Sequence, residues 1–143
     1  MSDTTDALGA AVDAEHAAVY TYGVLTAFTT GERRAAVATY IAEHRARRDE
    51  LNDALVSAGG QARATAPGYV LSVEVTNSAT AAKAALASED DAAQAYRSLA
   101  ERADTQPIRR LAVSGLTDCA LRAAYWRAAS GIKPATVALP GAK

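Results

Sequence analysis

The chain has 143 residues, of which 50% are apolar and 6% aromatic, and its formal net charge is −1 at pH 7. A chain of this length has enough residues for one domain with its own core. Its charge lacks the basic excess that non-specific binding to nucleic acid needs. We therefore expect a single domain, residues 1–143, that does not bind nucleic acid.

The N-terminal segment MSDTTDALGA is acidic and lacks the apolar stretch of a signal peptide. The sequence contains no uninterrupted apolar run of about 18 residues, which a membrane-spanning helix would need, so we expect no membrane partner. The single cysteine, Cys119, has no second cysteine with which to form an internal disulfide. Together these features predict a cytoplasmic protein.

Two helices are predicted in the first part of the chain. Apolar residues three and four positions apart predict one helix over residues 5–29 and a second over 32–58. Thr30-Gly31 separates them, and Gly59-Gly60 is a strong stop signal for the second. The many alanines favour helices because alanine loses no side-chain entropy there.

Between the second helix and residue 77 the helical period disappears. The segment GGQARATAPGYVLSVEV contains glycines, a proline and the alternating apolar residues Tyr69, Leu71, Val73 and Val75. A single strand would have no partner here, so we predict an extended crossover with its apolar side on the helices. About 18 extended residues can span about 60 Å, whereas a 25-residue helix is about 37 Å long. The crossover can therefore return to the far end and make the second and third helices parallel.

The rest of the chain predicts a second helical hairpin, with helices over residues 77–103 and 107–130. The tail, residues 131–143, contains two prolines and is expected to be extended, with Val137 and Leu139 against the helices. The predicted fold class is all-α: a four-helix bundle with one long crossover between the second and third helices.

Each predicted helix carries a carboxylate on or beside its apolar face: Glu15, Glu43, Glu89 and Asp118. The two acids of each hairpin are separated by nearly the same number of residues, so the hairpins bring each pair to one level. Burying ionised carboxylates without partners costs several kcal/mol apiece. These acids therefore need metal ions or cationic side chains as partners.

This arrangement resembles the ferritin-like superfamily over about residues 5–130. The segments AEHAAVYTYG, AEHRARRDEL and YWRAASG are more specifically similar to a bacterial ferritin-like domain family of unknown function. The superfamily resemblance implies a di-iron site built from one Glu on each of two helices and Glu-x-x-His on the other two. It also implies a homodimer that pairs through a flat helix face.

The resemblance gives five candidate metal ligands: Glu15, Glu43, His44, Glu89 and Asp118. Both histidines of the implied Glu-x-x-His motifs are absent, because Ala46 and Leu121 stand at those positions. His16 and His44 each directly follow a glutamate, and adjacent residues point about 100° apart on a helix. A neighbouring Glu and His can therefore hardly bind the same metal ion.

Two interpretations follow. In the first, Arg47, Arg48 and Arg122, each about one turn after a candidate ligand, complete a Glu-His-Arg network that satisfies the acids without metal. The protein is then a structural or interaction module with a degenerate di-iron layer, no cofactor and an unidentified protein partner. Arg47 is also expected to pair with Glu43 four residues before it. In the second, the protein is a di-iron or di-manganese oxidoreductase that uses the inter-helix carboxylates.

Overall fold

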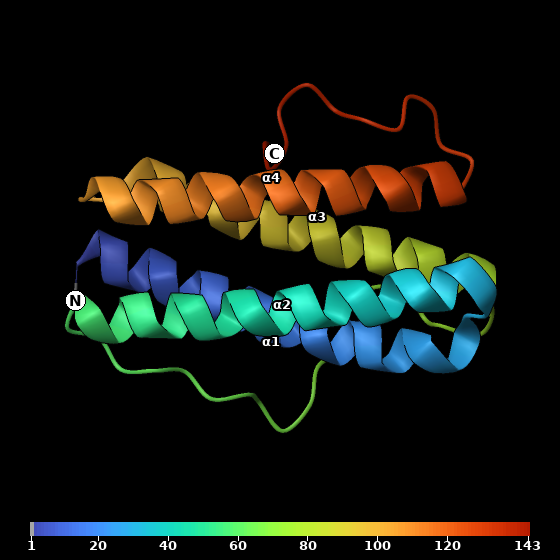
Figure 1. Ribbon diagram of the computed structural model, residues 1–143, viewed down its shortest axis with the longest axis horizontal. Coiled ribbons are helices and arrows are strands. Elements are labelled where there is room, and N and C mark those ends of the chain that lie inside the picture. The colour runs from blue at the N-terminus through green and yellow to red at the C-terminus, as the bar shows by residue number, and fades with distance from the viewer. Residues whose placement is uncertain (1) are drawn as a thin grey trace.

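Four α-helices and one long connection form the computed structural model, which describes residues 2–143 (Figure 1). The helices are α1 (Asp3–Leu25), α2 (Gly31–Ser57), α3 (Ser78–Arg102) and α4 (Gln106–Ala129). The first helix was predicted to reach residue 29, but its last turn tightens into a 3₁₀ helix, η1 (Thr26–Phe28). The other bounds lie within two residues of the predicted ones.

Polar side chains fix where the helices begin. Ser2 caps α1 by accepting a hydrogen bond from the backbone N–H of Thr5. At the start of α3, Asn77 and Thr80 form a reciprocal capping box. Thr105 caps α4 in the same manner as Ser2. These side chains satisfy backbone donors that the first turn of a helix leaves free.

The crossover between α2 and α3 runs back along the whole bundle (Figure 1). As a result α2 and α3 run in the same direction, and α1 and α4 run opposite to them, as the length of the crossover predicted. Leu71, Val73 and Val75 pack against the core, whereas Val70 is 99% exposed. The predicted fold class, a four-helix bundle with one long crossover, is confirmed.

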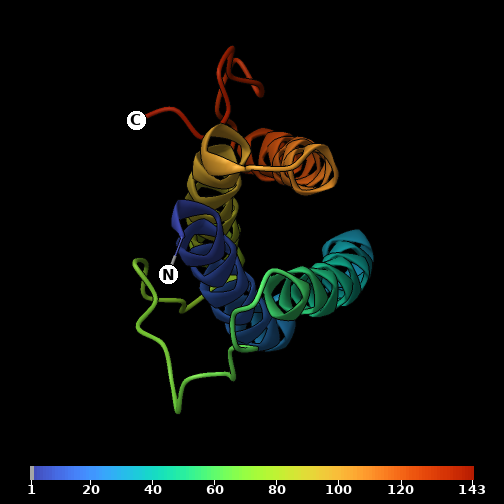
Figure 2. The same ribbon diagram turned by 90° about the vertical axis from the view of Figure 1, so that its left-hand side faces the viewer.

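The four helices do not pack equally around the core. Seen along the bundle, α1 and α3 lie side by side, α2 covers α1, and α4 covers α3 (Figure 2). On the fourth side, the backbones of α2 and α4 lie farther apart than those of the other neighbouring helices. Long side chains join α2 to α4 along this side, which is called the α2–α4 seam below.

The core consists of two apolar clusters separated by a polar layer. Near the start of α1, Leu8, Val12, Leu55 and Leu99 belong to the first cluster. Near the end of α1, the second cluster contains Tyr22, Leu25, Val37 and Trp126. The polar layer lies between them, at the middle of every helix.

The tail after α4 is held differently from what the sequence predicted. Val137 and Leu139 are 47% and 64% exposed, so they do not pack on the bundle. Instead, Arg127 donates a hydrogen bond to the carbonyl of Ala135 at 3.3 Å, and Arg97 donates one to Pro140 at 3.4 Å. Extended backbone leaves carbonyl groups without partners, and these two arginines supply donors to them.

Within residues 2–143, no helix combines the length and apolar character that crossing a lipid bilayer needs.

Candidate functional site

The polar layer contains one buried ionisable side chain from each helix: Glu15, His44, Glu89 and Arg122. The first three are completely buried and Arg122 is 2% exposed. These four residues are called the central layer below. Burial of four such groups at one level requires that they satisfy one another.

His44 lies between the two buried glutamates. Its Nδ1 is 3.0 and 3.1 Å from the two carboxylate oxygens of Glu15, and its Nε2 is 2.8 Å from Oε2 of Glu89. Ionised carboxylates only accept hydrogen bonds, so both ring nitrogens carry protons in this arrangement. Burial lowers the pKa of His44, but the charge of Glu89 and hydrogen bonds to both glutamates outweigh it and raise the pKa to about 9. His44 is therefore a cation at neutral pH.

Arg122 supplies the second cation. Its Nε donates to both oxygens of Glu89 at 3.0 and 3.1 Å, and its Nη1 donates to Oε1 of Glu43 at 3.2 Å. Burial raises the pKa of Glu89, but the charge and hydrogen bond of His44, together with Arg122, bring it below its usual value. Glu89 is therefore ionised, and it is the acid that accepts the most hydrogen bonds in the layer.

Two aromatic side chains extend the layer toward the second apolar cluster. Tyr22 Oη donates to Oε2 of Glu89 at 2.5 Å and accepts from Nε1 of Trp126 at 2.8 Å. Burial and the neighbouring charge of Glu89 raise the pKa of Tyr22 well above its usual value. The phenol thus keeps its proton and remains a donor to Glu89.

At the α2–α4 seam, acids and arginines pair between helices. Arg47 Nη2 donates to Oδ2 of Asp118 at 2.7 Å and to Oγ of Ser114 at 2.6 Å. The expected pair between Glu43 and Arg47 is not formed. Arg47 points toward α4, and Glu43 instead accepts a hydrogen bond from Arg122 of α4. Each of these arginines thus pairs with an acid of the opposite helix across the seam.

The structure separates the five candidate ligands into two groups. Glu15, His44 and Glu89 lie in the central layer, whereas the side chains of Glu43 and Asp118 are 42% and 36% exposed at the seam.

Other residues considered from the sequence lie outside the layer. His16 Nε2 bonds to the carbonyl of Arg63 at 2.8 Å and so holds the crossover. Arg48 pairs with its neighbour Asp49 at the surface. Sequence reasoning missed the part of Tyr22 and Trp126 as hydrogen-bond partners of the layer. Both lie within the predicted helices 5–29 and 107–130, and their residue type was the available signal, because buried Tyr and Trp usually find a polar partner.

The donor set of the central layer does not fit a di-iron centre. Glu15 and Glu89 do point inward from two helices, as that centre needs. The inward pair on α4, however, is Cys119 and Arg122, and a guanidinium has no lone pair to give to a metal ion. Both nitrogens of His44 are bonded to carboxylates. Among the described residues, no group of three or more His, Cys, Asp and Glu has an arrangement suited to a metal.

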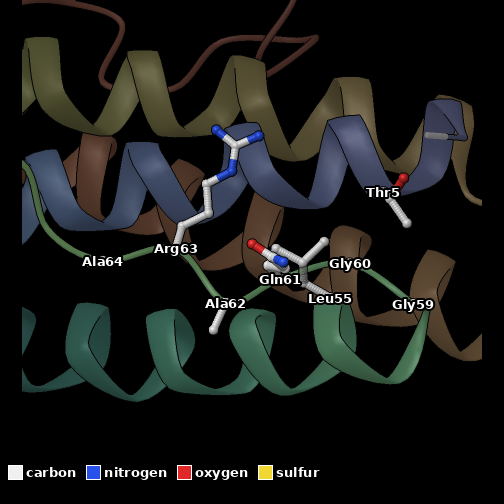
Figure 3. Close-up of a pocket in the computed structure, with 8 residues that line it drawn as sticks. All are labelled: Thr5, Leu55, Gly59, Gly60, Gln61, Ala62, Arg63 and Ala64. Atoms are coloured by element: carbon white, nitrogen blue, oxygen red, sulfur yellow. The ribbon is translucent and has the colours of Figure 1, made fainter.

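A cavity of about 510 Å³ lies elsewhere, where the crossover leaves α2 (Figure 3). Its lining residues are Thr5, Leu55 and Gly59 to Ala64, none of which belongs to the central layer. Beside it, Arg63 forms an ion pair with Asp13 at 2.6 Å, and Asn52 bonds to the backbone N–H and carbonyl of Arg63. These contacts fasten the crossover to α1 and α2.

Comparisons with known proteins agree with the fold. A family model described as a domain of unknown function (DUF4439) matches residues 7–143. The chain is similar to a conserved hypothetical protein, rv2844, from Mycobacterium tuberculosis, at 35% identity over 89% of this chain and 96% of that one, with a TM-score of 0.86. No curated protein matches significantly.

The chain is also similar in structure to a protein from Bacillus anthracis str. Ames whose structure is described as that of ferritin-like, diiron-carboxylate proteins. The identity is 15%, the match covers 89% of this chain and 94% of that one, and the TM-score is 0.74. At this identity the likeness concerns the fold, and it confirms the predicted ferritin-like architecture.

Proposed function

Because the chain belongs to the family described as a domain of unknown function (DUF4439), within the ferritin-like fold, we propose that it is a non-catalytic structural or interaction module. In this proposal His44 and Arg122 take the place that metal ions occupy in a di-iron protein. The observation that carries it is the pairing of both cations with the buried Glu89.

The charges of the central layer support this proposal. Two carboxylates, Glu15 and Glu89, face two cations, His44 and Arg122, so the buried charge is balanced. A metal ion bound to Glu89 would have to displace Arg122, and a displaced guanidinium would be left buried and unpaired. Leaving one member of a buried ion pair uncompensated costs about 3 to 5 kcal/mol. Metal ions and these side chains therefore compete for the same carboxylate.

The test is elemental analysis of protein produced with added iron and manganese. We expect far less than one metal ion per chain, and a thermal midpoint that chelators do not change. The control is Glu15→Ala prepared in the same way. Stoichiometric metal in the wild-type protein that is lost in Glu15→Ala would contradict the proposal.

One observation favours a second candidate, a di-iron or di-manganese oxidoreductase. Glu15 and Glu89 project from α1 and α3 into one buried layer, and the structural neighbour from Bacillus anthracis is described as a diiron-carboxylate protein. This candidate requires Arg122 to leave Glu89 and His44 to release a proton. Metal-dependent consumption of oxygen or peroxide that disappears in Glu89→Gln would support it.

We further propose that the module is a cytoplasmic homodimer that does not bind nucleic acid. Cys119 is a buried, free thiol, as suits a reducing compartment. Arg47, Arg97, Arg122 and Arg127 are each paired with an acid, which leaves less basic surface for phosphates. Cell fractionation and a filter-binding assay with DNA and RNA test these statements, and retention of labelled nucleic acid at physiological salt would contradict the last one.

A further inference from the structure

In the part of the chain that the structure describes, no element covers the outer surface of α2 and α4. The crossover and the tail lie on other sides of the bundle (Figure 2). The uncharged, exposed or half-buried residues on this side are Ala35, Thr39, Ala42 and Ala46 of α2 and Ser114, Thr117, Leu121, Tyr125 and Ala128 of α4. Leu121 projects most, with 66% of its surface exposed. This surface is called the α2–α4 face.

Charges of opposite sign gather at one end of the α2–α4 face. Asp53 follows His44 by two and a half turns of α2, and Arg110 precedes Cys119 by the same distance on α4, so both point away from the core. Both are exposed, and neither side chain has a hydrogen-bond partner in the part of the chain that the structure describes. Glu50, with a side chain 55% exposed, lies one turn before Asp53. The last turns of α2 are therefore acidic and the first turn of α4 is basic.

The ion pairs of the seam fix the level of these residues along the bundle. Arg47 lies opposite Asp118, and Glu43 lies opposite Arg122. Counting along the two antiparallel helices from these pairs puts Asp53 and Arg110 within about 3 Å of one level. The same count puts Leu121 at the level of the gap between Ala42 and Ala46.

From these levels we infer that the α2–α4 face binds a second copy of this chain, related by a two-fold axis parallel to the helices. This inference rests on the proposed homodimer and names its surface. A rotation about such an axis places α2 of each subunit against α4 of the other and keeps every level unchanged. Asp53 then faces Arg110 of the partner subunit, and the gap between Ala42 and Ala46 receives Leu121 of the partner subunit.

The α2–α4 face is large enough to bind a second copy of this chain. The 27 residues of α2 extend for about 40 Å, and two helices side by side are about 20 Å wide. The face thus offers about 800 Å² per subunit, which is the area of a standard interface. A two-fold axis perpendicular to the helices would instead carry the partner's Asp53 and the partner's Arg110 to the far end of the face, so these charges would not pair.

The test measures the mass in solution of the full chain and of matched variants, for example by sedimentation equilibrium. We expect the wild type to be a dimer and Leu121→Arg to raise the dissociation constant at least tenfold. Val70→Arg is the control, because it makes the same kind of change at a fully exposed residue of the crossover. It should leave the dimer intact. Circular dichroism of each variant checks that the helices are retained.

A charge exchange tests the pairing itself. Asp53→Arg and Arg110→Asp should each weaken the dimer, and the two together should restore it, because each cross-subunit pair is then formed with its charges reversed. Mixing Ala42→Cys protein with Leu121→Cys protein should also give cross-links between subunits, since native Cys119 is buried.

The outcomes separate this inference from the proposed function. A wild type that is monomeric at micromolar concentrations contradicts both the homodimer and its surface. A dimer that Leu121→Arg leaves unchanged contradicts only the surface, and the homodimer stands. Restoration by the charge exchange, together with cross-links between residues 42 and 121, supports the two-fold axis parallel to the helices.

Discussion

Glu89 is the residue on which the central layer depends most. It accepts hydrogen bonds from His44, Tyr22 and Arg122, which come from three different helices. Such an acid is stable in the interior only while its partners remain, since a buried charge without partners costs more than a pair contributes. Changes to the layer should therefore be strongly coupled to one another.

Removing Arg122 tests this coupling. We expect Arg122→Met to lower the free energy of unfolding by about 3 to 5 kcal/mol, because Glu89 loses its bonded cation while it stays buried. Adding Glu89→Gln to that variant should recover part of the loss, because the uncompensated charge is then gone. Urea denaturation at pH 7 measures both. If the loss in the double variant equals the sum of the losses in Arg122→Met and in Glu89→Gln alone, the two side chains act independently.

The raised pKa of His44 predicts how stability depends on pH. The folded protein holds the His44 proton up to about pH 9, whereas the unfolded chain releases it near pH 6.5. The contribution of His44 is therefore complete below pH 6.5 and is lost as pH rises through 9. The difference amounts to about 3 kcal/mol, because one pKa unit corresponds to about 1.4 kcal/mol.

Urea denaturation at steps from pH 6 to pH 10 measures this loss, with His44→Gln as the control. The variant should be less stable at pH 6 and should lack the decline. A wild-type stability that does not change across this range would contradict a protonated His44.

Two buried tyrosines offer a matched comparison of hydroxyl groups. Tyr22 Oη has two partners, but Tyr96 Oη, also buried, has none among the described residues. Tyr22→Phe should thus cost about 1 to 3 kcal/mol, because Glu89 loses one of its donors and Trp126 Nε1 loses its acceptor. Tyr96→Phe should be neutral or slightly stabilising. If thermal unfolding gives an equal loss for both, an ordered water on Tyr96 Oη is the physical explanation.

At the scale of the helices, two glycines distinguish close packing from chain entropy. The ring of Tyr96 lies directly against Gly115, so a methyl group there would collide with it, whereas nothing lies near Gly23 of α1. We expect Gly115→Ala to destabilise by about 1 to 3 kcal/mol through overpacking. Gly23→Ala should stabilise by about 0.5 to 1 kcal/mol, because glycine is a poor helix former. Thermal denaturation of both variants measures the contrast, and a stabilising Gly115→Ala would mean that α3 and α4 can move apart.

The helices themselves could be predicted from the sequence. Their apolar spacing, capping residues and glycine stops are local, and the length of the crossover was enough to orient α3. These features depend only on residues close together in the chain.

The pairing of the charged side chains could not be predicted in the same way. The local rule for residues four apart joins Glu43 with Arg47, but the structure joins Arg47 with Asp118 and Arg122 with both Glu43 and Glu89. These partners depend on how α2 and α4 are placed across the seam. A shift of one residue turns a side chain by about 100°, which separates the inward His44 from the half-exposed Glu43.

At the scale of the whole molecule, the bundle consists of two hairpins whose covalent connection is the crossover. Residues around Val70 are the natural point of cleavage, because Val70 is fully exposed and lies in an extended segment. The hairpins should remain together after cleavage there. The packing of α1 on α3, the bonds from His44 and Tyr22 to Glu89 and the bond from Arg122 to Glu43 join the two hairpins without the crossover.

Brief treatment with thermolysin, which cleaves before apolar residues such as Val70 and Leu71, should therefore give two fragments that elute together with unchanged helix content. Their separation should need urea, and it should occur at lower urea in Arg122→Met, because that variant loses the bond from α4 to Glu43 of the first hairpin. His16→Ala is a useful control, since it removes one of the contacts that hold the crossover at Arg63 and leaves the central layer unchanged. It should speed cleavage without separating the fragments. Fragments that come apart in native buffer would mean that the crossover, rather than the core and the central layer, holds the two hairpins together.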